Sequence, residues 1–417
     1  MNKYKESKFF NGLTFITSKN RNSEVVSVSF VIKAGSRYEQ SGQYGYAHLL
    51  EHMLLQGTES KPSAFEINRI IDRSGALFNV FTDVEVIRLS AIVAKDHLEK
   101  ILELMIEMVT EPIISKKVLE NEKKVVIQEL KRMLDNKVSR LWIESVKRVF
   151  IGHPLSHYPI GEENDIIEAT IEELKDYYDR FFVMSRMAIV VVGDIEHDEL
   201  ANFIEKRIGE GKSKKREIDN IAFPLSPQKG KVFIQMSGTQ TYLAFNFPIQ
   251  RYSFKESAIF DIIVNYLGYH HTSLLYQEIR HKLGLVYSIS ILNLFFRDAA
   301  LIHITTSTTF PDKVVELILD RVSRIKEYLD KNTFCEYQQQ VINIQKRKLA
   351  GAFEEMLFLL RNWNLYNRLV TPKEIREAIE EVNYQELIET VGKYLNKDNL
   401  LIVALGAKDC FGNQFRF

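Results

Sequence analysis

The sequence predicts an α+β fold composed of two similar halves that are related by internal duplication. Three observations support this prediction. A unit made of a helix and a strand occurs twice, a strand-like segment followed by helices lies early in each half, and a linker-like stretch lies near the middle. A length of 417 residues is enough for two or three domains with their own cores.

The early segments at 25–31 and 242–247 alternate apolar and polar residues, as half-buried strands do. The repeated unit occupies 171–193 and 384–406, where a helical pattern leads to an apolar, β-branched strand that ends in glycine. The two closing glycines are 406 − 193 = 213 positions apart. A constant separation of this kind indicates two copies of one structural unit.

The stretch at 209–227 is rich in Gly, Lys and Pro. Its basic run fits a solvated connector better than a phosphate-binding patch. We therefore place the domain boundary near 210–230, with an N-terminal domain at 1–215 and a C-terminal domain at 225–417.

Composition excludes several classes of function. Lys+Arg and Asp+Glu both number 55, so the net charge is near zero, which argues against a nucleic-acid or membrane-surface role. The first residues lack an apolar signal region, and no run of 18 apolar residues suggests a transmembrane helix. Only Cys335 and Cys410 are present, without a C-x-x-C pair, which fits a reducing compartment. We expect a cytoplasmic protein.

Two histidines and a glutamate interrupt the otherwise apolar segment 47–55. At about 100° per residue, His48, Glu51 and His52 share one narrow face of a helix. Histidines at i and i+4 can reach one Zn²⁺, and the glutamate of this H-x-x-E-H order can act as general base on a metal-bound water. The alternative is a pair of core histidines beside a surface glutamate, but burying such groups without partners is costly.

A further ligand is found in the amphipathic segment 118–134, whose apolar stripe includes Val118, Val125 and Val126. Glu122 and Glu129 fall in that stripe, where core residues are expected. Two carboxylates on a buried face need a cation or hydrogen-bond donors. The alternative is a tilted stripe with both glutamates at its edge.

These motifs resemble those of the pitrilysin/insulinase family of zinc peptidases, in the short-chain branch related to mitochondrial processing peptidase. That family pairs H-x-x-E-H with a downstream E-x6-E, the spacing of Glu122 and Glu129 (129 − 122 = 7). Segments 78–82, 153–161 and 280–287 resemble, in order, the family's N-A-x-T strand, its H-P-L-G…G segment and its R-x6-Y element.

The resemblance implies two halves that each have an antiparallel sheet backed by helices. It implies one Zn²⁺ per chain, held by His48, His52 and Glu129, with Glu51 as general base and Glu122 as a supporting acid. The N-terminal domain would then be the catalytic, metal-binding one.

The second half shows no equivalent metal site, because a shift of 213 places 48–52 on 261–265, which contain no histidine. By resemblance, this half contacts substrate. Arg280 would donate to a substrate carbonyl, and Tyr287 would donate to the oxyanion as it forms.

The resemblance further implies that Asn79, Val80, Phe81 and Thr82 form an edge strand that pairs with an extended peptide. An ordinary sheet strand is the alternative. One departure from the family is the loop 268–273, where His270 and His271 stand in place of glycines. These histidines could bind substrate or a second metal, but we favour the interpretation that they are ordinary polar loop residues. Val80 replaces a small alanine and Ile87 a common threonine, which suggests an altered pocket.

The sequence thus indicates a zinc metalloendopeptidase that hydrolyses short or unfolded peptides inside a dimer chamber. A homodimer is expected because the chain carries both the metal motif and the Arg280/Tyr287 pair; a heterodimer with a related chain stays open. The alternatives are a leader-peptide processing peptidase of a natural-product pathway and a non-catalytic scaffold subunit of a heterodimeric peptidase.

Overall fold

The computed structural model of the protein describes residues 3–21, 23–208 and 223–411. The chain divides into two compact units. Unit 1 comprises Met1–Arg132, His157–Ile221 and Lys348–Thr371, and unit 2 comprises Met133–Ser156, Ala222–Arg347 and Pro372–Phe417. No helix among the described residues is long and apolar enough to cross a membrane.

Unit 1 contains a six-stranded sheet in the order β1-β2-β6-β3-β5-β4. All neighbouring strands are antiparallel except the parallel pair of β2 and β6. The strands are β1 (Tyr4–Lys8), β2 (Thr14–Lys19), β3 (Val25–Ile32), β4 (Leu77–Thr82), β5 (Ile87–Ala94) and β6 (Met187–Gly193). Strand β4 is one end of the sheet, so one of its sides is free of a strand neighbour.

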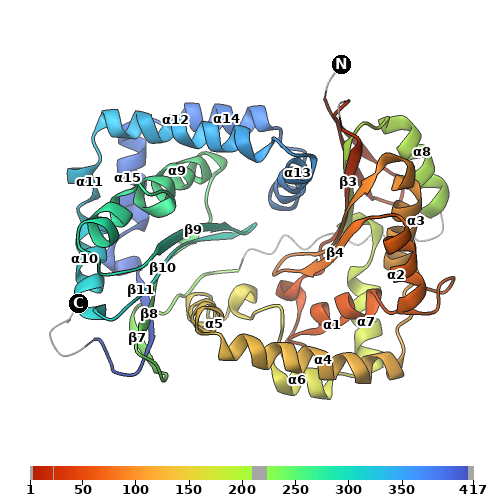
Figure 1. The fold of residues 1–417 in the computed structure, drawn as a ribbon, viewed down its shortest axis with the longest axis horizontal. Helices are drawn as coiled ribbons and strands as arrows, with labels where there is room; N and C mark the ends of the chain where they lie inside the picture. The colour runs from red at the N-terminus through yellow and green to blue at the C-terminus, as the bar shows by residue number, and fades with distance from the viewer. Residues whose placement is uncertain (1–2, 22, 209–222, 412–417) are drawn as a thin grey trace. The chain divides into compact units, whose positions relative to one another are not determined.

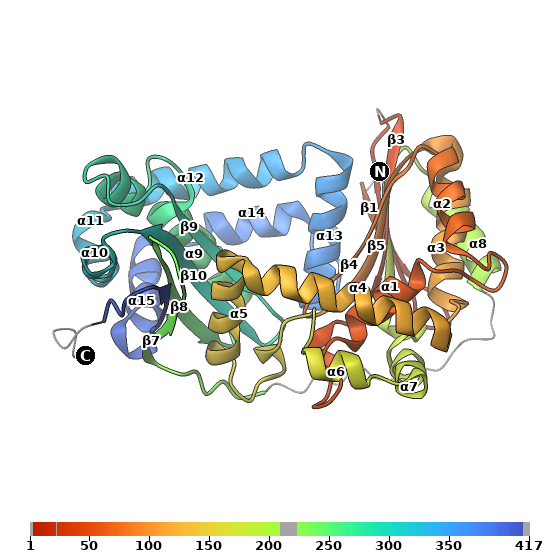
Figure 2. The ribbon, with the colours of Figure 1, turned by 60° about the horizontal axis from the view of Figure 1, so that its bottom comes forward.

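Helices cover both faces of this sheet (Figures 1 and 2). Both views place α2, α3 and α8 on one face and α13 on the other. The helices of this unit are α1 (Tyr46–Leu54), α2 (Ala64–Arg73), α3 (Leu98–Thr110), α4 (Lys116–Asp135, with its last turn in unit 2), α6 (Glu163–Glu168), α7 (Ile171–Phe181), α8 (His197–Ile208) and α13 (Ala352–Tyr366), with short 3₁₀ turns at Ser36–Tyr38, Lys95–His97 and Met184–Arg186.

Unit 2 contains a five-stranded sheet in the order β7-β11-β8-β10-β9, again with one parallel pair, β7 with β11. Its strands are β7 (Gly230–Gln235), β8 (Thr241–Gln250), β9 (Ile289–Phe295), β10 (Ala299–Thr308) and β11 (Leu401–Gly406). Its helices are α5 (Lys137–Val149), α9 (Phe254–Val264), α10 (Pro311–Ser323), α11 (Ile325–Tyr328), α12 (Lys331–Lys348), α14 (Pro372–Glu380) and α15 (Tyr384–Tyr394), with 3₁₀ turns at Pro154–Ser156 and Lys397–Asn399 and π-helical turns η5 (Asn265–Tyr269) and η6 (Tyr276–His281).

The predicted fold class is confirmed, and the internal duplication is visible in the order of the strands. Apart from β1, which has no counterpart, the order of the first sheet becomes that of the second when β2, β6, β3, β5 and β4 are replaced by β7, β11, β8, β10 and β9. Helix α7 and helix α15 also begin 384 − 171 = 213 positions apart. The expected antiparallel pairing holds in both sheets except at one parallel pair in each, β2 with β6 and β7 with β11.

The compact units differ from the contiguous domains at 1–215 and 225–417 because two helices are exchanged. Helix α5 comes from the first half of the chain but packs on β8 and β11 of unit 2. Helix α13 comes from the second half but packs on β6 and β3 of unit 1. Most of the predicted linker, at 209–222, lies outside the described residues.

Strand alternation explains how one sheet can receive helices on both faces. In β8, Phe245 and Phe247 belong to the apolar core that includes α9, whereas Asn246 between them faces α5, where its amide lies 3.5 Å from the Ser145 hydroxyl. In unit 1, Val31 of β3 belongs to the apolar cluster formed with α13. The helix exchange therefore completes one core in each unit.

Candidate metal centre

Helix α1 presents three of the predicted residues on one side. Its apolar residues Leu49, Leu50 and Met53 are fully buried, while the side chains of His48 and Glu51 are each 12% exposed. The helix begins after Gly45, whose φ of 109° favours glycine over any residue with a side chain.

Helix α4 supplies the third candidate ligand. The Oε2 atom of Glu129 lies 3.8 Å from Nε2 of His48 and 3.8 Å from Nε2 of His52. The two imidazole rings meet edge to face, with centroids 4.7 Å apart. The potential ligand atoms of these three residues all lie within 4.8 Å of one another. Glu129 is more exposed than the two histidines, so it lies at the edge of its helix stripe.

The donor set fits a zinc ion. Tetrahedral zinc with bonds of about 2.0–2.2 Å separates its ligand atoms by roughly 3.3 Å, and small side-chain rotations would bring the three atoms to that spacing. Two imidazoles and one carboxylate, with one coordination position left for water or substrate, form a set typical of catalytic zinc. The cluster consists of these three side chains.

Glu122 fixes the orientation of one ligand. Nδ1 of His52 donates a hydrogen bond of 2.9 Å to Oε2 of the buried Glu122. Because a carboxylate only accepts, Nδ1 carries the proton and Nε2 keeps its lone pair for a metal. The buried stripe of α4 runs through Leu119, Glu122 and Val126 and leaves Val125 49% exposed. The predicted stripe, which included Val125, was therefore rotated about the helix axis by part of a turn from the observed one.

Burial sets the charge states of the α1 side chains. It lowers the pKa of His48 to about 3, with a further lowering by His52, so His48 is neutral, as a metal ligand must be. Burial also raises the pKa of the Glu51 carboxyl, and contacts with Thr82 at the end of β4 oppose that shift. An elevated pKa is useful in a group that takes up a proton during catalysis.

Glu39 is a residue that the sequence reading missed. Its side-chain oxygens accept hydrogen bonds from the amides of Ala47 (2.8 Å) and Gly45 (3.1 Å), so it caps the helix that carries the histidines. Burial is the main cause that raises the pKa of Glu39 to about 8. The available signal was a charged residue nine positions ahead of H-x-x-E-H (48 − 39 = 9), but this spacing matches no standard capping motif.

The predicted substrate strand is β4, which stands at the free edge of its sheet. Val80 and Thr82 are buried, and α1 packs against this strand. Asn79 and Phe81 point to the opposite face and are exposed. The strand is therefore positioned beside the three candidate ligands within unit 1.

Arg280 and Tyr287 lie together in unit 2. Nε of Arg280 donates a 2.6 Å hydrogen bond to the backbone carbonyl of Tyr287, and its guanidinium lies 5.7 Å from the ring centroid of that tyrosine. Arg280 sits in the π-helical turn η6, a feature that is frequent at functional sites. The Tyr287 side chain is 82% exposed, which leaves its hydroxyl free for a ligand.

His270 and His271 form no second metal group. Among the described residues, the only set of three or more His, Cys, Asp or Glu side chains close enough to share an ion is that of His48, His52 and Glu129. The backbone carbonyls of His270 and His271 instead accept hydrogen bonds from Ser273 and Gln277.

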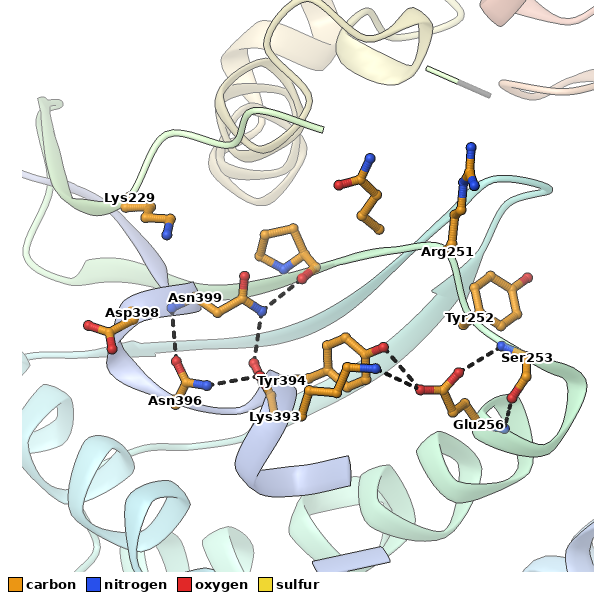
Figure 3. A pocket seen from close by; sticks show the side chains of 12 residues that line it. Lys229, Arg251, Tyr252, Ser253, Glu256, Lys393, Tyr394, Asn396, Asp398 and Asn399 are labelled. Atoms are coloured by element: carbon orange, nitrogen blue, oxygen red, sulfur yellow. Dashed lines mark hydrogen bonds and ion pairs between the residues drawn. The ribbon is translucent and has the colours of Figure 1, made fainter. Parts of the chain in front are cut away.

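A hollow of about 800 Å³ lies in unit 2 and contains none of the predicted site residues (Figure 3). Several of its polar groups bind each other: the hydroxyl of Tyr394 donates to Glu256 at 3.0 Å, and Asn399 donates to the carbonyl of Tyr394 at 2.8 Å.

Comparisons with known proteins agree with the geometry. A family model described as insulinase (peptidase family M16) matches residues 14–157, and one described as the M16 inactive domain matches 168–341. The first range contains the candidate ligands.

Relatives of similar length are called zinc proteases. An uncharacterized zinc protease of Rickettsia felis is 26% identical over 394 residues, which cover 93% of this chain and 94% of that protein. Zinc protease YmxG of Bacillus subtilis, also uncharacterized, is 28% identical over 302 residues, or 72% of each chain. A protease from Helicobacter pylori has a similar structure, with a TM-score of 0.87, 20% identity and coverage of 97% and 99%. A Pseudomonas fluorescens structure described as a peptidase M16 inactive domain gives a TM-score of 0.88 at 19% identity, with 98% coverage of both chains.

Proposed function

The chain belongs to the insulinase (M16) family of zinc proteases, and we propose that it is an active zinc metalloendopeptidase that hydrolyses short or unfolded peptides. One observation carries the proposal: His48, His52 and Glu129 offer three ligand atoms within 4.8 Å of one another. Glu51 lies on the same helix as the two histidines, with Oε2 3.9 Å from Nε2 of His48.

When bound, a zinc ion supplies positive charge that polarises the scissile carbonyl and the attacking water. Glu51 accepts the proton of that water and delivers it to the leaving amine, and its raised pKa suits both transfers. Glu122 keeps His52 in the tautomer whose Nε2 faces Glu129. Glu39 keeps the start of α1 in place.

The substrate backbone pairs with β4. A free sheet edge can accept an extended peptide through main-chain hydrogen bonds, and this mode tolerates many sequences. Thr82, at the end of this strand, contacts Glu51. A peptide bound along β4 would therefore run past the general base. Asn79 and Val80 supply part of the same edge.

Arg280 and Tyr287 assist catalysis from unit 2. The exposed Tyr287 hydroxyl donates to the oxyanion that forms when the carbonyl is attacked. Arg280 fixes the Tyr287 backbone, and its remaining donors bind a substrate carbonyl.

The working form is a homodimer whose chamber admits peptides but not folded proteins. The chain carries both the metal ligands and the Arg280/Tyr287 pair, so two copies can supply everything the site needs. Mixing Glu51→Gln subunits with Arg280→Ala subunits tests whether sites are shared between copies. Partial recovery of activity supports sharing, whereas no recovery in demonstrably mixed dimers places each site within one chain.

A scaffold role is disfavoured because the complete H-x-x-E-H motif and Glu129 converge on one point. Processing of a leader peptide is compatible with the same chemistry and differs only in substrate choice.

The decisive test combines zinc stoichiometry with peptide cleavage. Purified protein should contain about one zinc per chain by elemental analysis and should cleave quenched fluorogenic peptides. A chelator should stop cleavage, and added zinc should restore it. A zinc-loaded, folded protein that cleaves no peptide in a broad library would support the scaffold role instead.

A further inference from the structure

Arg88 lies on the face of the unit 1 sheet that α13 covers, between the part under that helix and the edge strand β4. On β5, it pairs with Val31 of β3 on one side and Phe81 of β4 on the other, so the three side chains share one face. Val31 is buried in the cluster that α13 completes, whereas Phe81 is 44% exposed. Arg88 therefore borders an uncovered strip of this face beside the edge strand.

Among the described residues, no acceptor binds the Arg88 guanidinium. Its carbon lies 5.4 Å from the ring centroid of Phe81, so the side chain leans toward β4. Its Nε atom is buried, and within the described part of the chain neither a hydrogen-bond acceptor nor an ion-pair partner reaches it. A partly buried cation without an acceptor is costly to maintain.

The acidic group whose charge acts on Arg88, Asp83, is already engaged. Burial lowers the pKa of Arg88, and Asp83 opposes that shift, so the two charges influence one another. The Asp83 carboxylate nevertheless accepts hydrogen bonds from the amides of Glu85 (2.7 Å) and Val86 (2.8 Å). It therefore caps its own turn, and the guanidinium keeps its donors available.

A peptide strand added to β4 brings a side chain within reach of this cation. Neighbouring strands lie about 4.8 Å apart, so the added residue opposite Phe81 stands roughly 10 Å from the Arg88 backbone on the same face. An arginine that leans across Phe81 and a glutamate that leans back can span this gap, and their contact would be a charge-assisted pair.

We propose that Arg88 is a specificity residue that binds the carboxylate of an acidic substrate residue, glutamate in particular, on the strand that pairs with β4. This inference rests on the proposed function, since it assumes that peptides bind along β4. Because Thr82, next to Phe81, contacts Glu51, the acidic residue would lie within roughly three positions of the cleaved bond. The protein would thus prefer acidic peptides.

Peptide binding tests the proposal without requiring hydrolysis. Zinc-loaded Glu51→Gln protein is titrated with a set of extended peptides whose side chains are uncharged except for one glutamate, which is placed at a different position in each peptide. A second set carries glutamine in place of each glutamate. Fluorescence anisotropy should reveal one position at which glutamate binds roughly tenfold more tightly than glutamine. Adding Arg88→Gln should bring this ratio to about one, and Arg88→Glu should favour lysine at that position.

Arg69→Gln, a change of an exposed arginine on α2, is the matched control and should leave the ratio unchanged. If Arg88→Gln fails to fold, Arg88→Met keeps the apolar contact with Phe81 and gives the same comparison. Equal binding of glutamate and glutamine peptides at every position, or a preference that survives both Arg88 variants, would overturn the assignment.

Cleavage by the wild-type protein separates this proposal from the proposed function. If peptides are cleaved but kcat/KM is insensitive to glutamate at every position, the role of Arg88 is wrong and the peptidase stands. If no peptide is cleaved but the binding preference depends on Arg88, the peptidase proposal fails and the acidic subsite stands.

Discussion

Glu122 accepts a 2.9 Å hydrogen bond from Nδ1 of His52, and this contact determines which ring nitrogen faces Glu129. The two glutamates stand one heptad apart on α4 but have different burial. Glu122 is buried and Glu129 is at the stripe edge, so one orients a ligand while the other is free to be a ligand. The candidate centre thus depends on the pairing of two helices.

Replacing Glu122 should weaken metal binding more than it weakens the fold. Without a carboxylate acceptor, the His52 ring loses its preferred tautomer, so Glu122→Gln should lower zinc affinity by about 10- to 100-fold. Competition with a chromophoric chelator measures the affinity. Gln128→Ala, at an exposed position of the same helix, is the control, and a variant whose zinc affinity equals that of the wild type would remove this role from Glu122.

Replacing Glu51 should separate metal binding from hydrolysis. Glu51 is 3.9 Å from His48 but is not one of the three clustered ligands, so Glu51→Gln should keep its zinc. Loss of the general base should reduce kcat by about 10²- to 10⁴-fold. Elemental analysis and a fluorogenic assay give the two readouts, with the exposed Glu59→Gln as control. Full turnover in Glu51→Gln would assign the proton transfer to another group.

The sequence predicted the ligand cluster because that cluster depends on local periodicity. His48, Glu51 and His52 lie within two turns of one helix, so their common face follows from helix geometry alone. The duplication was visible because the copies keep a constant separation.

The exchanged helices were not predictable in the same way. An amphipathic pattern shows that α5 and α13 bury a face, but it does not say which sheet receives that face. Trp363 of α13 belongs to the same apolar cluster as Val31 of β3 and Val190 of β6, and both strands are far from it in sequence. Glu39 was missed for a related reason, since its partners are backbone amides, which leave no pattern among side chains.

Glu39 should make stability depend on pH. Its folded pKa of about 8 exceeds the ordinary value of 4.5, so the folded protein holds an extra proton between these values. Its contribution to the free energy of unfolding is fully present below pH 4.5 and is lost as pH rises through about 8. The difference in stability between wild type and Glu39→Gln should change by a few kcal/mol across this range.

Urea unfolding of the metal-free protein at several pH values measures this difference without interference from zinc binding. Glu99→Gln, an exposed position in the first turn of α3, should show no such change. A constant difference between wild type and Glu39→Gln from pH 4.5 to 8.5 would contradict the raised pKa.

Tyr287 and Arg280 should act as a coupled pair. Tyr287→Phe removes only a hydroxyl, so zinc content should be unchanged while kcat falls by about 10²-fold through loss of an oxyanion donor. Arg280→Ala releases the carbonyl of Tyr287, so it should lower kcat as well. The double variant should then lose less than the product of the two single losses, because the second change acts on a tyrosine that is no longer held.

Steady-state kinetics on one fluorogenic peptide give kcat for the wild type, the two single variants and the double variant, which complete a double-mutant cycle. Tyr269→Phe changes another partly exposed tyrosine of unit 2 and should keep wild-type kcat. Losses that multiply independently would mean that Arg280 acts only through its contact with a substrate carbonyl and not through Tyr287. In that case the 2.6 Å bond to Tyr287 would serve only to shape the loop between them, and Arg280→Ala should raise KM more than it lowers kcat.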